Sequence, residues 1–430
     1  MDYFGIISVL IVLSAIFGYV NAKFLKLPTT IGLMLITIVF TLLIVILSIF
    51  DDSLLLREKE LISGIDFKTV LLDIMLSFLL FAGALHTNFD QLRVQRWPVL
   101  VFATLGVLIS TFLVGIFTYY LLMILGMEVA FIYCLLFGAL ISPTDPISVL
   151  GILKKANAPK KLETKIVGES LFNDGVGVVV FLTIFSVASS AAGSADGGVE
   201  VSDIALLFVQ EVFGGLILGL ILGYITYFLM KSIDDYEVEV IITIATVMGG
   251  TLLAHELHLS APLAMVAAGL MVGHDTVRES AMSEMVETYV DKFWELIDVL
   301  LNTLLFVLIG MEMLILTFDF NYILAGLISV PLTLAARFLS LWMPIKFFAK
   351  RLNFVPKTNL IMTWGGLRGG ISIALALSLS NEMHRDLFLV ITYIIVVFSI
   401  IGQGLTVGPI VKKLTQNYVD EDEPNGLSHH

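Results

Sequence analysis

The sequence has few charged residues. Charged side chains make up 14% of the 430 residues and hydrophobic ones 58%, and the mean hydropathy is +0.98. Soluble domains contain about 25% charged and about 45–50% apolar residues. Hydrophobic runs of roughly 20 residues recur from Tyr3 to Val411 and leave no stretch long enough for a soluble domain. The composition excludes an ordinary soluble protein and predicts an all-α integral membrane protein in contact with membrane lipid.

The sequence also has a single cysteine and lacks two common functional motifs. The only cysteine, Cys134, lies in an apolar run, which excludes a disulfide framework and a cysteine-based metal site. The sequence contains neither a Walker-type glycine-rich loop nor a Gly-x-Ser-x-Gly nucleophile motif. The net charge is −13, and there is no basic stripe that would suit nucleic acid. We therefore expect no cofactor, no ATP-driven step within this chain and no nucleic-acid partner.

The hydrophobic runs divide into about thirteen predicted transmembrane spans. They lie near residues 3–21, 29–50, 69–87, 98–125, 130–152, 166–190, 204–230, 238–258, 261–273, 294–317, 320–347, 358–380 and 387–411. If spans 1–6 and 8–13 are repeats around span 7, the second copy is inverted and span 5 corresponds to span 12. Inverted repeats of this kind are a known transporter design.

Basic residues predict how the chain is oriented in the membrane. With the N-terminus outside, 18 of the 24 Lys and Arg residues fall in inner loops and only Arg57, Lys59, Lys68 and Arg385 in outer loops. Cytoplasmic loops are enriched in Lys and Arg, so the bias predicts an outside N-terminus and a cytoplasmic C-terminus. The two remaining residues, Arg337 and Arg368, lie inside the membrane, where a charge needs a partner or a watery cavity.

The fifth span is interrupted by Ser142-Pro143-Thr144-Asp145-Pro146. Two prolines three residues apart remove backbone donors and clash with preceding carbonyls, so we predict an unwound stretch here. Freed carbonyls in the membrane are tolerated against protein or a cavity, where Thr144 and Asp145 can also face a cation. A simple proline kink with a capping Asp145 is the alternative.

The sixth span carries two acids in Glu169-Ser170-Leu171-Phe172-Asn173-Asp174. Helical spacing places Ser170 and Asp174 on one face and Glu169 and Asn173 on the neighbouring face. A desolvated carboxylate binds either a proton or a hard cation, and that competition is the minimal chemistry of antiport. A neutral aspartic acid used only for helix packing is the alternative.

The twelfth span contains Trp364-Gly365-Gly366-Leu367-Arg368-Gly369-Gly370. Four glycines within six residues weaken a helix and predict a second broken segment near 364–370, although glycines also serve ordinary close packing. For Arg337 in the eleventh span we expect Glu169 as partner, because the two charges neutralise one another and leave Asp174 free to titrate. Snorkelling of Arg337 towards the inner surface is the alternative.

These segments together resemble the monovalent cation/proton antiporters of the NhaP and eukaryotic Na⁺/H⁺-exchanger type. The matching residues are Ser142 to Pro146, Gly168 to Gly175, Ala336-Arg337 and Gly365 to Gly369. The resemblance implies thirteen helices, with an ion-translocating bundle and dimerisation helices within residues 1–415. A short cytoplasmic tail would follow at 416–430. It also implies a homodimer in the cell membrane.

The resemblance also implies roles for single residues. Asp174 would bind the cation and carry the proton, with Ser170 and Thr144 as further oxygen ligands of Na⁺ and Asp145 acting directly or through water. Asn173 would hold the crossing of the broken helices together and Glu169 would pair with Arg337, while the role of Arg368 stays open. An Asn at 173 resembles the electroneutral branch, which exchanges one cation for one proton.

One position departs from the family pattern. Many members carry an acid in the third span after Leu-Phe, whereas this sequence reads Leu80-Phe81-Ala82-Gly83-Ala84. An auxiliary proton-binding or pH-sensing role of position 82 is therefore in doubt.

Taken together, the sequence predicts a secondary Na⁺/H⁺ antiporter working by alternating access around Asp174, a transporter and not an enzyme. A K⁺/H⁺ antiporter of the same fold is the nearest alternative. An intramembrane aspartyl protease could use Asp145 and Asp174, but the Gly-x-Gly-Asp motif expected around one of its acids is missing. A passive cation channel would explain an unwound helix but not a lone titratable carboxylate beside a neutralised pair.

Overall fold

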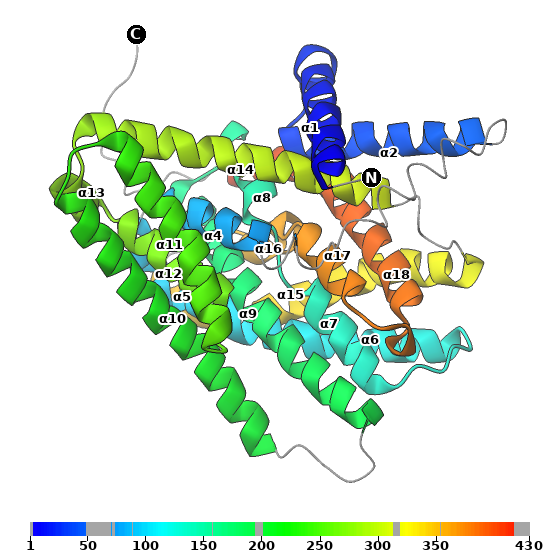
Figure 1. The fold of residues 1–430 in the computed structure, drawn as a ribbon. Coiled ribbons are helices and arrows are strands. Elements are labelled where there is room, and N and C mark those ends of the chain that lie inside the picture. Colours follow the sequence, from blue (N-terminus) through cyan, green and yellow to red (C-terminus); the bar gives the residue numbers. More distant parts are fainter. Residues whose placement is uncertain are drawn as a thin grey trace.

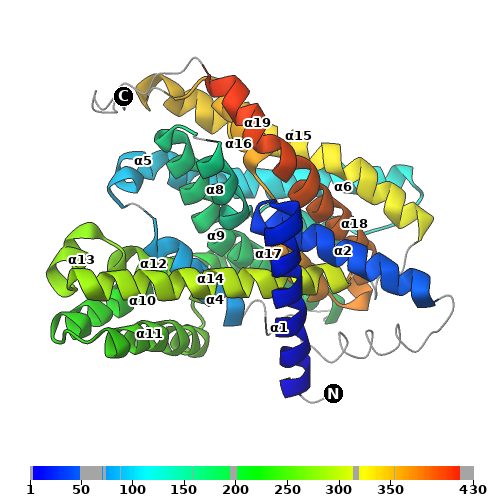
Figure 2. The ribbon, with the colours of Figure 1, turned by 90° about the horizontal axis from the view of Figure 1, so that it is seen from above.

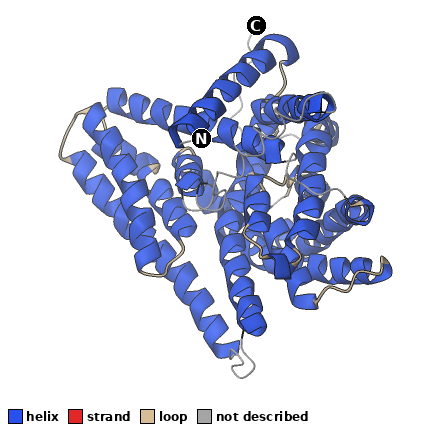
Figure 3. Ribbon diagram, turned by 45° about the vertical axis from the view of Figure 1, so that its right-hand side comes forward, coloured by secondary structure: helices blue, strands red, loops and turns tan. Residues whose placement is uncertain are grey.

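The computed structural model confirms an all-helical membrane fold (Figures 1 and 3). It describes residues 3–48, 70, 74–87, 89–156, 158–193, 201–312, 319–352 and 354–416, and every regular element within these ranges is a helix. Among the described residues, nine helices are long and apolar enough to cross a membrane, and one bent pair forms a further span. Three shorter apolar helices fall within predicted spans 3, 5 and 9. The count of thirteen stays a prediction, and nearly all of the predicted tail lies outside the described residues.

The helices have the following bounds. The first half contains α1 (Tyr3–Val20), α2 (Thr29–Ser48), α4 (Leu76–Leu85), α5 (Phe89–Val101), α6 (Val107–Ile124), α7 (Phe131–Ile141), α8 (Pro146–Lys155) and α9 (Lys160–Gly193). The second half contains α10 (Val201–Lys231), α11 (Tyr236–Glu256), α12 (Ala261–Val272), α13 (Asp275–Ala281), α14 (Glu284–Glu312), α15 (Phe320–Leu352), α16 (Thr358–Gly365), α17 (Gly370–Leu377), α18 (Arg385–Val397) and α19 (Gly404–Thr415).

The helices form two groups that meet along α9 (Figure 2). In one group α10, α11 and α12 pack together and against α4, while α14 packs on α1, α2, α4 and α11. In the other group α6 packs on α7 and α15, and α18 packs on α15 and α17. The long helix α9 contacts α7 and α8 of the second group and α10 and α12 of the first. It therefore lies at the boundary between the two groups.

Small residues allow the closest helix contacts. A methyl group added to Gly138 of α7 would meet the carbonyl oxygen of Thr111 of α6, and one added to Gly219 of α10 would meet that of Ala264 of α12. Without a hydrophobic force between helices in lipid, such close backbone approach supplies much of the packing energy. The glycines thus determine which helix faces meet.

The charged stretch before α14 is organised by Arg278. Sequence periodicity predicts a span near 294–317, but the helix begins at Glu284 and continues through Glu312. Arg278 of α13 donates to the carboxylate of Asp291 at 2.8 and 2.9 Å, to Glu287 at 3.1 Å and to the carbonyl of Leu85 at 3.0 Å. Glu287 and Asp291 are therefore bound to the guanidinium of Arg278, which joins α13, α14 and the end of α4.

Candidate functional site

Two interrupted helices cross in the middle of the second group. Helix α7 ends at Ile141 and α8 begins at Pro146, while α16 ends at Gly365 and α17 begins at Gly370 with a bend of 52°. The backbone N–H of Asp145 donates to the carbonyl of Leu367 at 2.8 Å, so the two breaks touch each other. The crossed broken helices predicted near 142–146 and 364–370 are confirmed.

Arg368 binds the carbonyl groups that the first break leaves free. Its Nη1 donates to the carbonyl oxygens of Ser142 and Pro143, the latter at 2.8 Å, and its own N–H donates to Ser399 Oγ at 2.8 Å. The side chain is buried. Because carbonyls without partners are costly inside a membrane, one guanidinium here satisfies two of them and joins both breaks. This gives Arg368 a structural position that the sequence left open.

Asn173 connects α9 to the first break. Its Nδ2 donates to Thr144 Oγ1 at 2.8 Å and to Glu169 Oε1 at 3.3 Å, and its Oδ1 accepts from the N–H of Thr144 at 3.1 Å. The hydroxyls of Thr144 and Ser170 lie 2.8 Å apart and share a hydrogen bond. The unwound backbone is thus held against α9 by three side chains of the predicted site.

Glu169 and Arg337 form a buried ion pair. Arg337 Nη1 lies 2.6 Å and Nη2 2.7 Å from the two carboxylate oxygens of Glu169, and both side chains are at most 2% exposed. Charges this deep require neutralisation, and the opposite charges supply it, with one hydrogen bond from Arg337 Nη2 to Glu169 Oε2. The pair connects α9 to α15 beside the crossing.

Asp174 lies on the same helix but faces a cavity. The cavity has a volume of about 40 Å³, and Asp174, Asp145 and Thr144 line it together with Leu80 and Leu305 among other apolar side chains. Among the described residues, no side chain donates a hydrogen bond to the Asp174 carboxylate. Ser170 does not line this cavity. A space of this size holds a monovalent cation or a water molecule next to the carboxylate.

The ionised side chains around the crossing carry one more negative than positive charge. The cluster contains the carboxylates of Asp145, Glu169 and Asp174 and the guanidiniums of Arg337 and Arg368, and Asp174 interacts electrostatically with Asp145, Glu169 and Arg368. With all five ionised, one monovalent cation or one proton makes the cluster neutral. Because a net charge in the membrane interior is costly, binding of either a cation or a proton by the cluster is favourable.

Sequence reasoning missed a polar residue of this cavity, Ser372. It lies in the first turn of α17 and lines the same cavity as Asp174. The signal was its position two residues after Gly370, at the start of the second half of the broken helix. The carboxylate of Asp145 lies against Gly369, next to the positive end of the α17 dipole.

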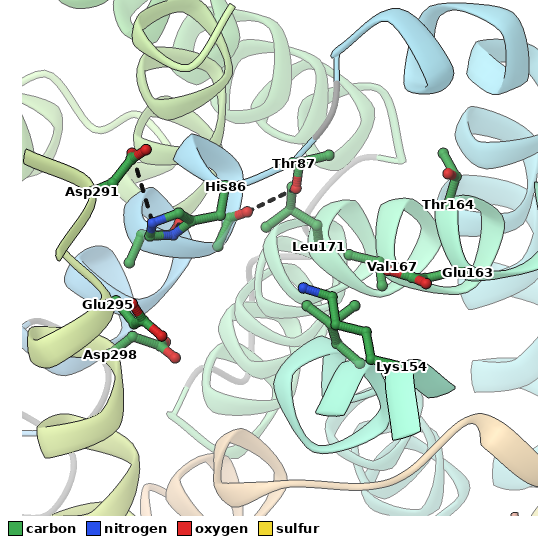
Figure 4. Close-up of a pocket in the computed structure, with 13 residues that line it drawn as sticks. His86, Thr87, Lys154, Glu163, Thr164, Val167, Leu171, Asp291, Glu295 and Asp298 are labelled. Atoms are coloured by element: carbon green, nitrogen blue, oxygen red, sulfur yellow. Dashed lines mark hydrogen bonds and ion pairs between the residues drawn. The ribbon is translucent and has the colours of Figure 1, made fainter. Parts of the chain in front are cut away.

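A larger cavity of about 520 Å³ opens between α4 and α14 on one side and α8 and α9 on the other (Figure 4). Glu295 and Asp298 lie on its α14 wall, and Lys154 points into it from the opposite wall (Figure 4). Ala82, the position where many family members carry an acid, also lines it.

Neighbouring cavities extend from this one towards Asp174. Asp298 also lines a cavity of about 220 Å³, and Asn302 lines both that cavity and the one at Asp174. Asn302 Nδ2 donates to Asp298 Oδ1 at 3.1 Å. Shared lining residues thus place the three cavities in a row that ends at the crossing, and no pattern in the sequence indicated that α14 contributes to it.

Comparison with known proteins gives consistent matches over most of the chain. The family model for the sodium/hydrogen exchanger, transmembrane, matches residues 11–413. The chain is 49% identical over 414 residues to the Na⁺/H⁺ antiporter NhaP of Pseudomonas aeruginosa, covering 95% of this chain and 96% of that protein. It is 34% identical over 397 residues to the Na⁺/H⁺ antiporter NhaH of Halobacillus dabanensis, covering 91% and 93%.

A solved structure shows the same fold. The sodium proton antiporter MjNhaP1 from Methanocaldococcus jannaschii superimposes with a TM-score of 0.72 over 96% of this chain and 98% of that one, at 21% sequence identity. Since the family model and the relatives cover nearly the whole chain, the protein belongs to the transmembrane sodium/hydrogen exchanger family and is a transporter, not an enzyme.

Proposed function

We propose that this protein exchanges one Na⁺ for one H⁺ at the carboxylate of Asp174. The observation that carries the proposal is this carboxylate, which faces a small cavity beside the crossed breaks without a protein donor among the described residues. A carboxylate and nearby oxygens bind Na⁺, and the same carboxylate binds a proton. The names of the relatives favour Na⁺ over K⁺ as the exchanged cation.

The geometry supports the predicted ligands to different degrees. Asp174, Asp145 and Thr144 all line the cavity, so a cation held there would lie beside their oxygens. Ser170 reaches the site through its hydrogen bond to Thr144, which orients the threonine hydroxyl. Na⁺ would therefore take Asp174 and Thr144 directly, with Asp145 as a direct or water-mediated ligand and Ser170 as a ligand once its bond to Thr144 loosens.

Alternating access would use the boundary between the two helix groups. The row of cavities reaches Asp174 from the side of Lys154, which the charge bias assigns to the cytoplasm. A neutral site, holding either ion, crosses the membrane interior at lower energy than an empty one with its net charge. Movement of the group that contains α6, α7, α8, α15, α17 and α18, together with α9, against the other group would then carry either ion across. Existing ion gradients would drive the exchange.

Proteoliposome transport tests the assignment. Asp174→Asn removes the charge and keeps the shape, and we expect it to abolish Na⁺-dependent dissipation of a pH gradient. Asp386→Asn is the matched control, since Asp386 is exposed in the first turn of α18. Normal exchange by the Asp174→Asn and Asp174→Ala variants would overturn the proposal. A panel of Na⁺, Li⁺ and K⁺ in the same assay tests the K⁺/H⁺ alternative.

Electrical measurements test the one-to-one ratio. If the cluster carries either one cation or one proton in both directions, an imposed membrane potential leaves the rate of exchange unchanged. A rate that rises with the potential would show unequal stoichiometry, and large voltage-dependent currents would favour a channel. A cavity of about 40 Å³ between Asp145 and Asp174 is too small for a peptide segment, which argues against a protease.

The proposal extends to a homodimer in the cell membrane, with an outside N-terminus and a cytoplasmic C-terminus. Support comes from the distribution of Lys and Arg between the predicted loops and from the family resemblance. A membrane-impermeant maleimide should label Lys154→Cys, in a Cys134→Ser background, in everted vesicles but not in intact cells. Native mass spectrometry of the purified protein tests the dimer.

A further inference from the structure

Ser372 is a buried hydroxyl without a hydrogen-bond partner among the described residues. Its side chain is 0% exposed, and Ser372 is among the residues that line the cavity shared by Asp174 and Asp145. Buried hydroxyls are normally bonded, and even the half-buried Ser378, just after the same helix, donates to the carbonyl of Leu375 at 2.7 Å. A buried hydroxyl without a partner, in a cavity that two carboxylates also line, is positioned to bond to a group outside the protein.

The other hydroxyls at the crossing are already engaged. Thr144 Oγ1 accepts from Asn173 and shares a hydrogen bond with Ser170 Oγ. Ser142 Oγ donates to the carbonyl of Gly138 at 2.7 Å. Ser372 therefore offers lone pairs that no described residue competes for.

The backbone of α17 fixes this hydroxyl in place. A methyl group added to Gly369 would come within 2.9 Å of Asp145 Cβ and Oδ2, and one added to Gly370 would come within 2.9 Å of Ile309 Cδ1 on α14. The two glycines thus let the first turn of α17 press against both Asp145 and α14. Ser372, in that turn, is held towards the cavity by packing on two sides.

From these contacts we infer that the Ser372 hydroxyl is an oxygen ligand of the transported cation, together with the carboxylate of Asp174. The inference rests on the proposed exchange at Asp174. Hard monovalent cations prefer several oxygen ligands, and a hydroxyl adds one without adding charge. A proton on Asp174 needs no such ligand. Ser372 therefore contributes to cation affinity and selectivity and not to proton binding.

Three substitutions separate ligation from packing. Ser372→Ala removes the oxygen, Ser372→Cys keeps the volume but replaces oxygen by sulfur, a poor ligand for hard cations, and Ser372→Thr keeps the oxygen. We expect Ala and Cys to raise the Na⁺ concentration for half-maximal exchange roughly fivefold to tenfold, and Thr to stay within about twofold. The Li⁺/Na⁺ preference should change in the Ala and Cys variants, while the maximal rate is retained. Ser378→Ala is the matched control.

Equilibrium binding provides an independent readout. The increase in melting temperature of the purified protein on adding Na⁺ should be smaller in Ser372→Ala and Ser372→Cys than in the wild type and Ser378→Ala. Unchanged half-maximal Na⁺ and unchanged selectivity in the Ala and Cys variants would overturn the inference. So would a Cys variant that behaves as wild type while Ala does not, because that result indicates packing. Absence of exchange in the wild type would instead reject the proposed function itself.

Discussion

Arg368 and Pro143, 225 positions apart in the chain, are joined by a hydrogen bond of 2.8 Å between Nη1 and the carbonyl oxygen. This contact lets a proline-broken helix exist inside a membrane. The break frees the carbonyls of Ser142 and Pro143, and the guanidinium from the second broken segment satisfies both. Each interrupted helix therefore depends on the other.

Replacement of Arg368 should disrupt this dependence. In Arg368→Lys an ammonium keeps the charge but lacks the planar fork that reaches two carbonyls at once, so we expect a lower melting temperature and slower exchange. Arg368→Gln should have the larger effect, with an estimated loss of about 3 kcal/mol or more, because it also removes a charge that balances the buried carboxylates. Thermal unfolding in detergent and proteoliposome transport measure both effects. Arg93→Lys, at an exposed position of α5, is the control and should behave as wild type.

The pair Glu169–Arg337 should show strong coupling in a double-mutant cycle. Glu169→Gln or Arg337→Gln alone leaves one buried charge unpaired, which typically destabilises a protein by about 3–5 kcal/mol. The double variant carries two neutral amides, so its loss should be clearly smaller than the sum of the single losses. Thermal or denaturant unfolding of the four proteins gives the coupling energy. Additive losses would mean that the 2.6 Å contact contributes little.

Asn173→Asp should impair the protein although the change is nearly isosteric. A carboxylate cannot donate, so the hydrogen bonds from Nδ2 to Thr144 Oγ1 and Glu169 Oε1 are lost and two acids face each other. We expect a melting temperature several degrees lower, corresponding to about 1–3 kcal/mol, and slower exchange. Asn173→Ser, which keeps a donor, should lose less. Equal stability of Asn173→Asp and wild type would contradict the network described.

Asp298 should affect the entry of cations and not their binding at Asp174. Its carboxylate lies where two cavities meet on the way to the crossing. Removing its charge in Asp298→Asn lowers the local cation concentration, so the rate at low Na⁺ should fall about 2- to 10-fold and recover at saturating Na⁺. The difference should shrink as ionic strength rises, because salt screens the attraction. The exposed Asp386→Asn serves again as control.

Gly138 tests one of the closest helix contacts. Gly138→Ala introduces a methyl group against the backbone carbonyl of Thr111, which cannot rotate away, so α6 and α7 must separate. We expect destabilisation by about 1–3 kcal/mol. Gly151→Ala in α8 is the matched control, since a methyl group there meets nothing within 4 Å. A melting temperature equal to that of the control would rule out tight packing at Gly138.

Much of the fold could be predicted from the sequence, because the lipid bilayer restricts which structures can span it. A helix in a membrane must satisfy its own backbone and present apolar side chains, so long hydrophobic runs reveal spans directly. Prolines and clustered glycines likewise mark the two breaks, at 142–146 and 364–370. The contacts of Glu287 and Asp291 in the first two turns of α14 with Arg278 could not be predicted in this way, because they form between two different helices.

The functional site, too, was predicted from the sequence only in part. Residue chemistry alone pointed to Asp174, to the oxygens around it and to a partner for Arg337, since charges in a membrane are few and each demands an explanation. Which atoms meet depended on how distant helices cross. Only the tertiary structure brought Arg368 to the carbonyls of the first break and placed Ser372 and α14 beside the cavity. Such contacts arise from packing between segments hundreds of residues apart, and neither local periodicity nor composition encodes them.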